Sequence, residues 1–569
     1  MNYKEELAKA LAPLTNLFYK DILELLEVPK DESFGDFAFP CFTLAKEKKI
    51  APPKIAQQIF DEFTSNLFSA TVAGPYLNFT IKDENFVSEN ISSINKASTL
   101  TKSSQESKLV LVESPSPNTN KPLHLGHLRN MLLGQSIVKL LKAVGKKAKL
   151  VNVINDRGVH ICKSMLAYKL WGNNQTPEEA NRKPDHFVGD WYVRFNKEES
   201  KSDQAKLDLE LQVQDMLLKW ENKNPEVMAL WEKMNAWAYE GWDVTFKKLN
   251  FNIDKNYLES ETYQGGKDII LKALDEGLFE KNEDGAVIVD LTKQNLDKKV
   301  LLRSNGTSVY ITQDINLAKI RHNDFKFDEL IYIVGNEQEY HFKVLFEIFQ
   351  ILNFPFANSC KHFSYGMVEL PEGKMKSREG NVIDTDELLE QTKQLAKEAV
   401  EERYNDLSDE EKEKRAEFIG TGAIRFFFLK HDALKNFVFD PKESLSFEGE
   451  TGPYVQYTHA RISSILRKSE SDYKNADLSL LNTAEDKSLT KTLTRFSDVV
   501  TESALKYKPN HLCNYLISVC QAFNTYYSKH RIIQDNKELE AARCALLVAI
   551  NKVIKEGLSY LDIESPEVM

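Results

Sequence analysis

The sequence predicts an α/β protein whose parallel sheet carries helical insertions, between an N-terminal α+β domain and a C-terminal all-α bundle. Three observations indicate this class. An apolar run, Leu109–Val112, is followed by an irregular turn and a helix-like run, Leu128–Leu141, in the order strand, turn, helix. Two more apolar runs of strand length follow, at Val151–Ile154 and Leu330–Val334. After about residue 404, strand patterns nearly vanish and helical ones follow one another.

The N-terminal region, residues 1–105, is expected to be a small α+β domain. Helical patterns cover Tyr3–Leu26 and Pro53–Ser65, and Ala73–Lys82 alternates like a half-buried strand. The polar stretch Lys96–Lys108 is expected to be a linker to the next domain.

The central region, residues 106–403, is expected to hold the sheet. Residues from about 172 to 250 are helical, acidic and rich in tryptophan, which favours an inserted helical subdomain. Residues 404–569 are expected to form a bundle, with Gly557 ending the last helix. The expected bundle helices are Glu417–Lys430, Tyr454–Ser469, Leu489–Tyr507, His511–His530 and Lys537–Glu556.

Composition places the chain among ordinary globular proteins and excludes several classes. The 569 residues are 28% charged and 42% hydrophobic, and no run reaches the length of a membrane span. The six cysteines are scattered without a C-x-x-C pair, which argues against structural zinc and disulfides and favours the cytoplasm. The net charge of −11 disfavours non-specific nucleic-acid binding but permits recognition of a folded RNA by a local basic surface.

The turn after the first strand, Glu113–Asn130, is the most informative segment. It contains His124 and His127 on either side of Gly126, directly before the helix. The free N–H groups of a helix N-terminus favour a phosphate, the histidines add donors, and a glycine lets a nucleotide approach the backbone. Taken alone, the pattern equally fits a capped helix start with two surface histidines.

A second glycine-bracketed segment, Glu372–Asn381, follows the apolar stretch His362–Leu370 and precedes a helix-like run, Asp384–Arg403. It reads E-G-K-M-K-S-R-E-G-N, and alone it favours a solvated charged loop. Together, the two segments resemble the H-x-G-H and K-M-S-K-S signatures of the class I aminoacyl-tRNA synthetases. Both would then lie at the carboxyl ends of strands in a Rossmann-like domain, where open α/β sheets bind ligands.

Further segments resemble one family of that class, the arginyl-tRNA synthetases, over nearly the whole length. The first signature is extended as S-P-N-T-N-K-P-L-H-L-G-H-L-R-N, and Y-I-T-Q-D, Tyr310–Asp314, is similar to the family's arginine-pocket motif. Ser33–Pro40 resembles an N-terminal element, and Thr451–Ile462 resembles the start of the anticodon-binding domain.

The resemblance implies a ligase that activates L-arginine with ATP and transfers it to the 3′ end of tRNA(Arg). It also implies Mg²⁺ carried by ATP, no metal site of the protein's own and no separate editing domain. The implied catalytic residues are His124, His127, Lys374 and Lys121. The implied ATP-binding residues are Gly126, His124, His127, Met367, Val368, Lys374, Met375, Lys376 and Ser377.

The second signature departs from the class pattern. Ser377 stands where a lysine is usual, between Lys376 and Arg378. In such family members a lysine just before H-x-G-H is thought to replace the missing one, and Lys121 stands there. Without the resemblance, a solvated turn lysine is the favoured interpretation of Lys121.

Recognition of a guanidinium requires carboxylates. The resemblance places Tyr310, Asp314 and Glu259 around the guanidinium, and each alone also fits a plainer role, such as a helix N-cap for Asp314 or a surface acid for Glu259. The full implied arginine-binding set is Ser116, Asn118, Glu259, Tyr310, Asp314 and Gln338.

For the tRNA, Tyr454, Tyr457 and Arg461 fall on one face of a helix, a spacing that is also common in core-facing stripes. The resemblance makes this face an anticodon surface, joined by Met569. It places Tyr76 and Asn78 near the tRNA elbow. A monomer without membrane partners is expected.

Three alternatives remain open at this point. A glutamyl- or class I lysyl-type enzyme keeps the fold, although Asp314 would repel an acidic substrate. A small-molecule adenylyltransferase shares H-x-G-H but needs no large helical C-terminal domain. A non-catalytic tRNA-binding paralogue is disfavoured by the intact His124, His127, Lys374 and Asp314.

Overall fold

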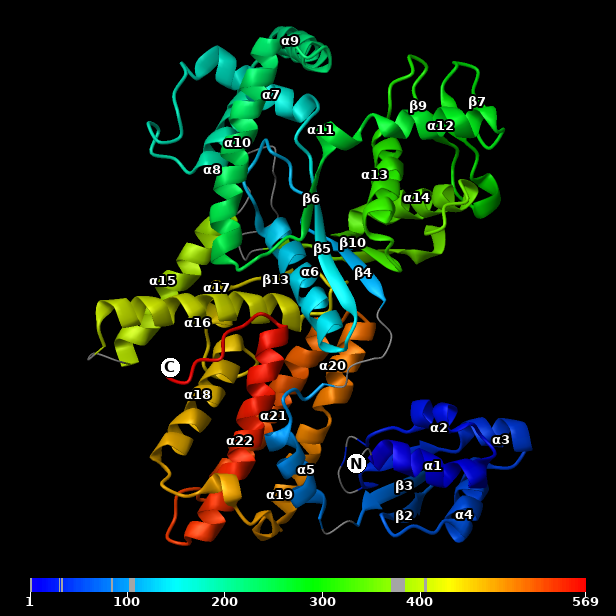
Figure 1. The fold of residues 1–569 in the computed structure, drawn as a ribbon, viewed down its shortest axis with the longest axis vertical. Coiled ribbons are helices and arrows are strands. Elements are labelled where there is room, and N and C mark those ends of the chain that lie inside the picture. The colour runs from blue at the N-terminus through cyan, green and yellow to red at the C-terminus, as the bar shows by residue number, and fades with distance from the viewer. Residues whose placement is uncertain are drawn as a thin grey trace. The chain divides into compact units, whose positions relative to one another are not determined.

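The computed structural model describes residues 3–29, 31, 34–82, 85–101, 108–369, 384–403 and 407–569. The chain divides into two compact units (Figure 1). The first comprises Met1–Ser98, Ile465–Thr494 and Ala522–Lys552. The second comprises Thr99–Ser464, Arg495–Gln521 and Val553–Met569. Segments of the C-terminal region therefore belong alternately to the first and to the second unit.

The first unit contains a three-stranded antiparallel sheet in the order β1-β3-β2. Gly74, with φ of +58°, lies in the tight turn between β2 and β3, and the expected strand Ala73–Lys82 corresponds to β3. Tyr3 packs edge-on against Phe68 and Phe86 in the core. The elements up to the linker are α1 Tyr3–Thr15, α2 Tyr19–Leu25, β1 Phe37–Pro40, α3 Phe42–Lys48, α4 Pro52–Glu62, β2 Phe68–Ala73, β3 Tyr76–Ile81 and α5 Phe86–Lys96.

The second unit is built on a five-stranded parallel sheet in the order β11-β10-β4-β5-β6. Its central strands are continuous apolar runs because helices cover the sheet. Leu111, Val151 and Leu330, from three neighbouring strands, share one core cluster. The strands are β4 Leu109–Glu113, β5 Lys147–Ile154, β6 Lys255–Leu258, β10 Glu329–Gly335 and β11 Cys360–Tyr365.

The helices that follow the strands include the long, almost fully buried α6, and β7–β9 form a small antiparallel sheet of their own. These elements are α6 Leu125–Ala143, α11 Glu259–Thr262, α12 Gly265–Asp275, β7 Glu280–Lys281, β8 Val287–Val289, β9 Lys299–Leu302, α13 Tyr310–Phe325, α14 Glu339–Ile351 and β12 Val368–Glu369.

Between β5 and β6 the chain leaves the sheet and forms four helices around their own aromatic core (Figure 1). Trp191, Trp220 and Phe195 are buried in this core, which accounts for the tryptophan-rich composition of the segment. The helices are α7 Val159–Trp171, α8 Pro184–Glu199, α9 Asp203–Glu221 and α10 Pro225–Lys248. We call them the helical insertion.

The C-terminal third is helical apart from the two-residue strand β13. Its elements are α15 Thr385–Arg403, α16 Asp409–Lys430, β13 Phe437–Val438, α17 Pro441–Ser444, α18 Gly452–Lys468, α19 Ala484–Thr494, α20 Phe496–Leu505, α21 Pro509–Lys529 and α22 Lys537–Tyr560.

Several helix boundaries differ from those expected. The segment Tyr3–Leu26 forms two helices, with Asn16 in the left-handed region at φ of +58° between them. Leu489–Tyr507 is likewise divided between α19 and α20. Gly557 does not end α22: it lies inside the helix, where a side chain would collide with Leu516 at 2.6 Å from its Cβ. The glycine therefore eases the packing of α22 against Leu516 and does not act as a C-cap.

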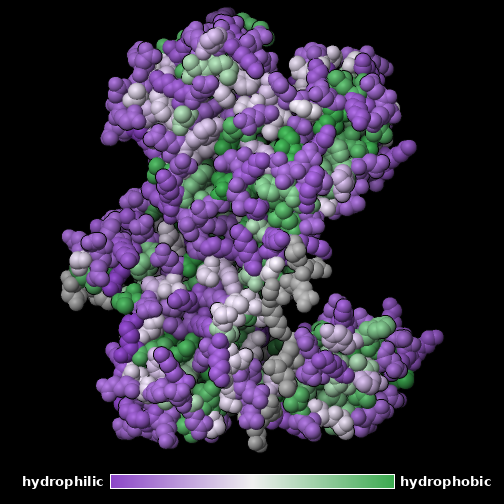
Figure 2. Space-filling model, viewed as in Figure 1, coloured by the Kyte–Doolittle hydropathy of each residue, from purple (hydrophilic) through white to green (hydrophobic). Residues whose placement is uncertain are grey.

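The face of the molecule in Figure 2 is mostly hydrophilic, with green side chains in separate small areas. Within the described ranges, no helix combines the length and the apolar content that a membrane span requires.

Candidate active site

The predicted site residues of the second unit follow the carboxyl ends of neighbouring parallel strands. Asn118 comes after β4 and forms a parallel backbone bridge with Asn155, which comes after β5. Glu259 begins α11 directly after β6, and Gln338 lies in the short turn after β10. The sheet order thus brings residues from distant parts of the sequence to one edge, as expected for this fold.

The signature turn, residues 121–127, begins α6 with a reciprocal cap made by its two histidines. The Gly126 N–H donates to His124 Nδ1 at 3.1 Å, and the His124 N–H donates to His127 Nδ1 at 3.2 Å. The two rings stack with centroids 3.8 Å apart. The two Nδ1 atoms therefore cap the helix start, as the plainer interpretation expected. The Nε2 atoms of both rings take no part in this cap and can bind another partner.

Both imidazoles are neutral near pH 7. Burial, reinforced by the charge of Lys121, lowers the pKa of His124 to about 3. Burial, together with His124 and Lys121, lowers the pKa of His127 well below its usual range. Because each Nδ1 accepts a backbone N–H, the single proton of each neutral ring belongs on Nε2. The turn therefore presents two uncharged N–H donors.

Gly126 has a different local role from the one expected. A Cβ at this position would meet His124 Cε1 at 3.0 Å and Nδ1 at 3.2 Å. The absence of a Cβ at Gly126 thus leaves room for the ring of His124, which folds back over the glycine. Any effect of the glycine on a ligand would act through the position of this ring. Its assignment to ATP binding stays a prediction.

Lys121 and His124 line a cavity of about 370 Å³ between the signature turn, the helical insertion and the start of α15. Burial lowers the pKa of Lys121. Asn118, His186, Tyr192 and Asp384 also line this cavity. A lysine placed here can reach an anion bound beside the histidines, as the substitution of Lys121 for the missing loop lysine requires.

The second signature lies outside the described residues, including Lys374, Met375, Lys376 and Ser377. On its N-terminal side, Met367 is 39% exposed, whereas Val368 is buried in β12, which pairs with β13. On its C-terminal side, the backbone of Asp384 pairs with that of His124. The described chain therefore resumes after the second signature in contact with the first signature.

The predicted arginine pocket brings Tyr310, Asp314 and Glu259 to the same edge. Tyr310 begins α13 and Asp314 lies one turn further along, so Asp314 is not the N-cap, which is Val309. Tyr310 is 74% exposed. Glu259 is 8% exposed, so it is not a surface acid. The negative charge of Asp314 acts on Glu259, as expected for two acids facing one cation site.

Both carboxylates already face cationic or titratable groups of the chain. Arg157 Nη1 lies 3.7 Å from Glu259 Oε1, with the guanidinium 3.9 Å from the ring centre of Tyr263. Burial raises the pKa of Glu259 to about 7, against the opposing effect of Arg157. His341 Nε2 lies 2.7 Å from Asp314 Oδ2. Sequence reasoning missed Arg157 and His341, because nothing in the residues around them indicates these partners.

Two further residues of the implied arginine-binding set, Ser116 and Asn118, lie in the loop after β4. Ser116 has a φ of +59°, its N–H donates to Asn152 Oδ1 at 2.9 Å and its hydroxyl donates to Glu113 at 3.1 Å. Glu113 in turn pairs with the buried Arg321. The loop that carries Ser116 and Asn118 is thus fixed by polar contacts with two strands.

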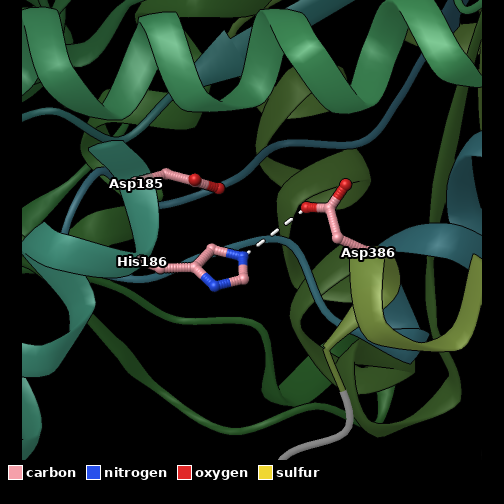
Figure 3. Close-up of side chains that lie close together, drawn as sticks. All are labelled: Asp185, His186 and Asp386. Carbon is pink, nitrogen blue, oxygen red and sulfur yellow. Dashed lines mark ion pairs between the residues drawn. The ribbon is translucent and has the colours of Figure 1, made fainter. Parts of the chain in front are cut away.

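A second group of charged residues lies between the insertion and α15. Asp185, His186 and Asp386 place possible ligand atoms within 4.8 Å of one another (Figure 3). Lys183 Nζ lies among them, 2.5 Å from Asp386 Oδ2 and 3.2 Å from Asp185 Oδ1. The Lys183 ammonium therefore stands where a metal ion would have to bind. These side chains do not fit a metal ion in addition to the ammonium.

Comparison with known proteins assigns the whole chain. A family model for the catalytic domain of class I tRNA synthetases (R) matches residues 90–441. A DALR anticodon-binding model matches residues 455–569, and a model of the arginyl-tRNA synthetase N-terminal domain matches residues 1–81. The chain belongs to the arginyl-tRNA synthetase family.

Full-length relatives agree with this assignment. Arginine–tRNA ligase of Phocaeicola vulgatus is 41% identical over 610 residues, covering 100% of both chains. That of Treponema denticola is 45% identical over 560 residues, covering 96% of this chain and 94% of the relative. The Thermus thermophilus arginyl-tRNA synthetase structure covers 100% of both chains, with a TM-score of 0.83 and 27% identity. The predicted fold class, family and arginine–tRNA ligase activity are confirmed.

The residues that the family resemblance assigned to tRNA are placed in both units. On α18, Tyr457 is 37% exposed and Tyr454 and Arg461 are partly buried, so this face is not the core-facing stripe of the plainer interpretation. Met569 is 7% exposed and packs in a core cluster with Ala460 of α18.

In the first unit, Tyr76 packs edge-on against the exposed Phe42. Asn78 is 4% exposed in the central strand β3. Its side chain therefore does not face a surface. All six assignments to the tRNA stay predictions.

Proposed function

We propose that this synthetase activates L-arginine with MgATP at the sheet edge and then transfers it to the terminal ribose of tRNA(Arg). In the first step a carboxylate oxygen of arginine attacks the α-phosphorus of ATP, and pyrophosphate leaves. The protein supplies no nucleophile, so its work is to align the reactants and to stabilise charge on the phosphates.

The observation that carries the proposal is the pairing of two unlike subsites at one edge. On one side, His124 and His127 offer neutral Nε2 donors beside Lys121, a set suited to phosphate oxygens. On the other side, Glu259 and Asp314 offer carboxylates suited to a guanidinium. The loop with Ser116 and Asn118 runs between them, where the α-amino and carboxyl groups of arginine belong.

The remaining ATP contacts belong to the second signature and its preceding strand. Lys374, Met375, Lys376 and Ser377 supply the phosphate contacts expected of that signature, and Met367 and Val368 lie beside the adenine. Mg²⁺ enters as part of the substrate MgATP, bridging phosphate oxygens and neutralising charge there.

For the tRNA, we assign the anticodon to the exposed face of α18 around Tyr457, supported from beneath by Met569. The elbow falls to Tyr76 and its neighbours. We further propose a monomer that acts in the cytoplasm, where its six buried cysteines, none of them in a disulfide, stay reduced.

The test is ATP–pyrophosphate exchange with each of the twenty amino acids, with and without tRNA(Arg). We expect exchange with arginine alone, because lysine lacks the planar fork that two carboxylates can bind. Exchange with lysine or glutamate at a comparable rate would contradict the proposed pocket. Comparison of the two tRNA conditions establishes whether activation requires the RNA.

A further inference from the structure

We infer that a buried ion cluster fastens the helical insertion to the signature turn, and that His186 is a positioning residue for adenylate formation. The cluster, called here the insertion clasp, consists of Lys183, Asp185, His186, Thr245, Asp384 and Asp386. The inference rests on the proposed role of His124, His127 and Lys121 at the phosphates.

The first link of the clasp is between backbones. Asp384 pairs with His124 in an antiparallel bridge, and the Thr385 N–H donates to the Leu123 carbonyl at 3.0 Å. The His124 N–H is also the donor that caps His127 Nδ1. A displacement of Asp384 is therefore transmitted to the backbone of one signature histidine and to the ring of the other.

The second link is between side chains. Asp384 Oδ1 accepts the N–H groups of Asp386 at 2.7 Å and Glu387 at 3.2 Å, which caps α15. The other oxygen, Oδ2, lies 3.1 Å from His186 Nε2 of α8. His186 Nε2 also lies 3.5 Å from Asp386 Oδ2 (Figure 3). One imidazole thus bridges both carboxylates at the start of α15.

Lys183 at the start of α8 and Thr245 of α10 add to the same contact. Lys183, just before α8, lies 2.5 Å from Asp386 Oδ2, and the Thr245 hydroxyl of α10 donates to that oxygen at 2.9 Å. Gly241 of α10 allows the close approach of Asp185, because a Cβ there would lie 2.2 Å from Asp185 Oδ1. Two helices of the insertion therefore converge on the first turn of α15.

Protonation of His186 brings the charges of the clasp closer to balance. Two buried carboxylates, Asp185 and Asp384, and the largely buried Asp386 face Lys183 and His186, and Lys248 Nζ lies 3.7 Å from Asp386 Oδ1. Burial alone would lower the pKa of His186, but the carboxylates of Asp384 and Asp386 raise it to about 9. Removal of this imidazolium leaves Oδ2 of the buried Asp384 without a cationic partner, while Oδ1 keeps its two backbone N–H donors. Such a carboxylate moves toward water or takes up a proton.

The insertion clasp lies next to the proposed phosphate-binding residues, but we assign none of its side chains to the substrates. His186 and Asp384 line the same cavity as Lys121 and His124. The arginine-side acids Glu259 and Asp314 follow other strands and belong to other elements. Loss of the clasp should therefore slow the activation step while the binding of arginine stays unchanged.

The experiment measures ATP–pyrophosphate exchange in full-length His186→Ala and His186→Gln. For His186→Ala we expect kcat to fall about ten- to a hundredfold, as misplacement of reacting groups by less than 1 Å would produce. The KM for arginine should stay within about twofold of the unchanged enzyme. His186→Gln, which keeps a donor toward Asp384, should recover part of the lost kcat.

Two controls accompany these variants. Glu199→Gln breaks the 2.7 Å pair between Lys163 and Glu199 elsewhere in the insertion, and it should leave exchange unchanged. His127→Ala tests the proposed function itself. Full exchange in His127→Ala would overturn that function, whereas slow exchange in His127→Ala with full exchange in His186→Ala would overturn only the clasp. A parallel loss of kcat, arginine affinity and thermal stability in His186→Ala would also overturn it, since that pattern marks a purely structural residue.

Discussion

The proposed phosphate side of the site has two neutral imidazoles held by backbone N–H groups, whereas the proposed arginine side has carboxylates that already face Arg157 and His341. On the first side, geometry is fixed by caps within one helix turn. On the second, it is fixed by ion pairs between elements that are distant in sequence.

This difference shows how one sheet edge can hold an anion and a cation together. Neutral donors orient the phosphates without adding charge, so we expect the compensating charge to come from the Mg²⁺ of MgATP, from Lys121 and from the lysines of the second signature. On the proposed arginine side, Arg157 Nη1 lies 3.7 Å from Glu259 and His341 Nε2 lies 2.7 Å from Asp314, so both acids already have a partner within the chain. The substrate then adds to, or replaces, an existing pairing and does not enter an uncompensated acidic pocket.

The largest effect is expected from His127. His127→Ala should lower the turnover number of exchange by about ten- to a thousandfold with little change in arginine affinity, because a transition-state donor is lost. His127→Asn is the matched variant: it can still accept the His124 N–H but has no counterpart of the Nε2 donor. If His127→Asn were as active as the unchanged enzyme, the ring would serve only as a cap.

Lys121 comes next. Lys121→Ala should slow activation about a hundredfold, since one charged partner of the phosphates is lost. Ser377→Lys in that background should restore part of the rate. Lys142→Ala, at an exposed position at the other end of α6, serves as the control and should have no effect. An unaffected Lys121→Ala would mean that Lys376 or Arg378 supplies the charge, or that none is needed.

On the arginine side, Asp314→Asn should raise the KM for arginine by about 10- to 150-fold, the equivalent of losing one charge-assisted pair of about 1.5–3 kcal/mol. The KM for ATP should change little. Asp284→Asn, an exposed acid of the neighbouring small sheet, is the control and should behave like the unchanged enzyme. An unchanged arginine KM in Asp314→Asn would remove this residue from the pocket.

The smallest effect concerns pH. The pKa of Glu259 is raised to about 7, so the carboxylate that we assign to the guanidinium is largely protonated below that pH. The KM for arginine should therefore rise as pH falls through 7, by about tenfold at pH 6. Glu259→Gln should flatten this dependence while raising the KM at pH 8. Identical pH profiles in the two enzymes would assign the titration to another group.

The sequence predicted those features whose residues lie close together along the chain. His124, Gly126 and His127 are adjacent, and Tyr310 and Asp314 are one helical turn apart, so their spacing could be recognised without a structure. The apolar runs of β4, β5 and β10 likewise identified the parallel sheet.

The pairs that organise those residues could not be predicted. Arg157 with Glu259, and His186 with Asp384, join segments that meet only after the sheet and the insertion have folded. Gly557 is a similar case. Its position near the end of a helical pattern suggested a C-cap, but in the structure it packs against Leu516 of another helix. Short β6 and the small sheet β7–β9 were missed because two to four residues carry no periodic signal.

The neutral state of the signature histidines is the central claim, and ¹⁵N NMR of the full-length enzyme with labelled histidine tests it most directly. His124→Gln and His127→Gln variants assign the two resonances. We expect both rings to show a protonated Nε2 and an unprotonated Nδ1, unchanged from pH 8 to pH 5, because the pKa of His124 is about 3 and that of His127 is well below its usual range. A ring that titrates near pH 6.5, or one protonated on Nδ1, would contradict the account.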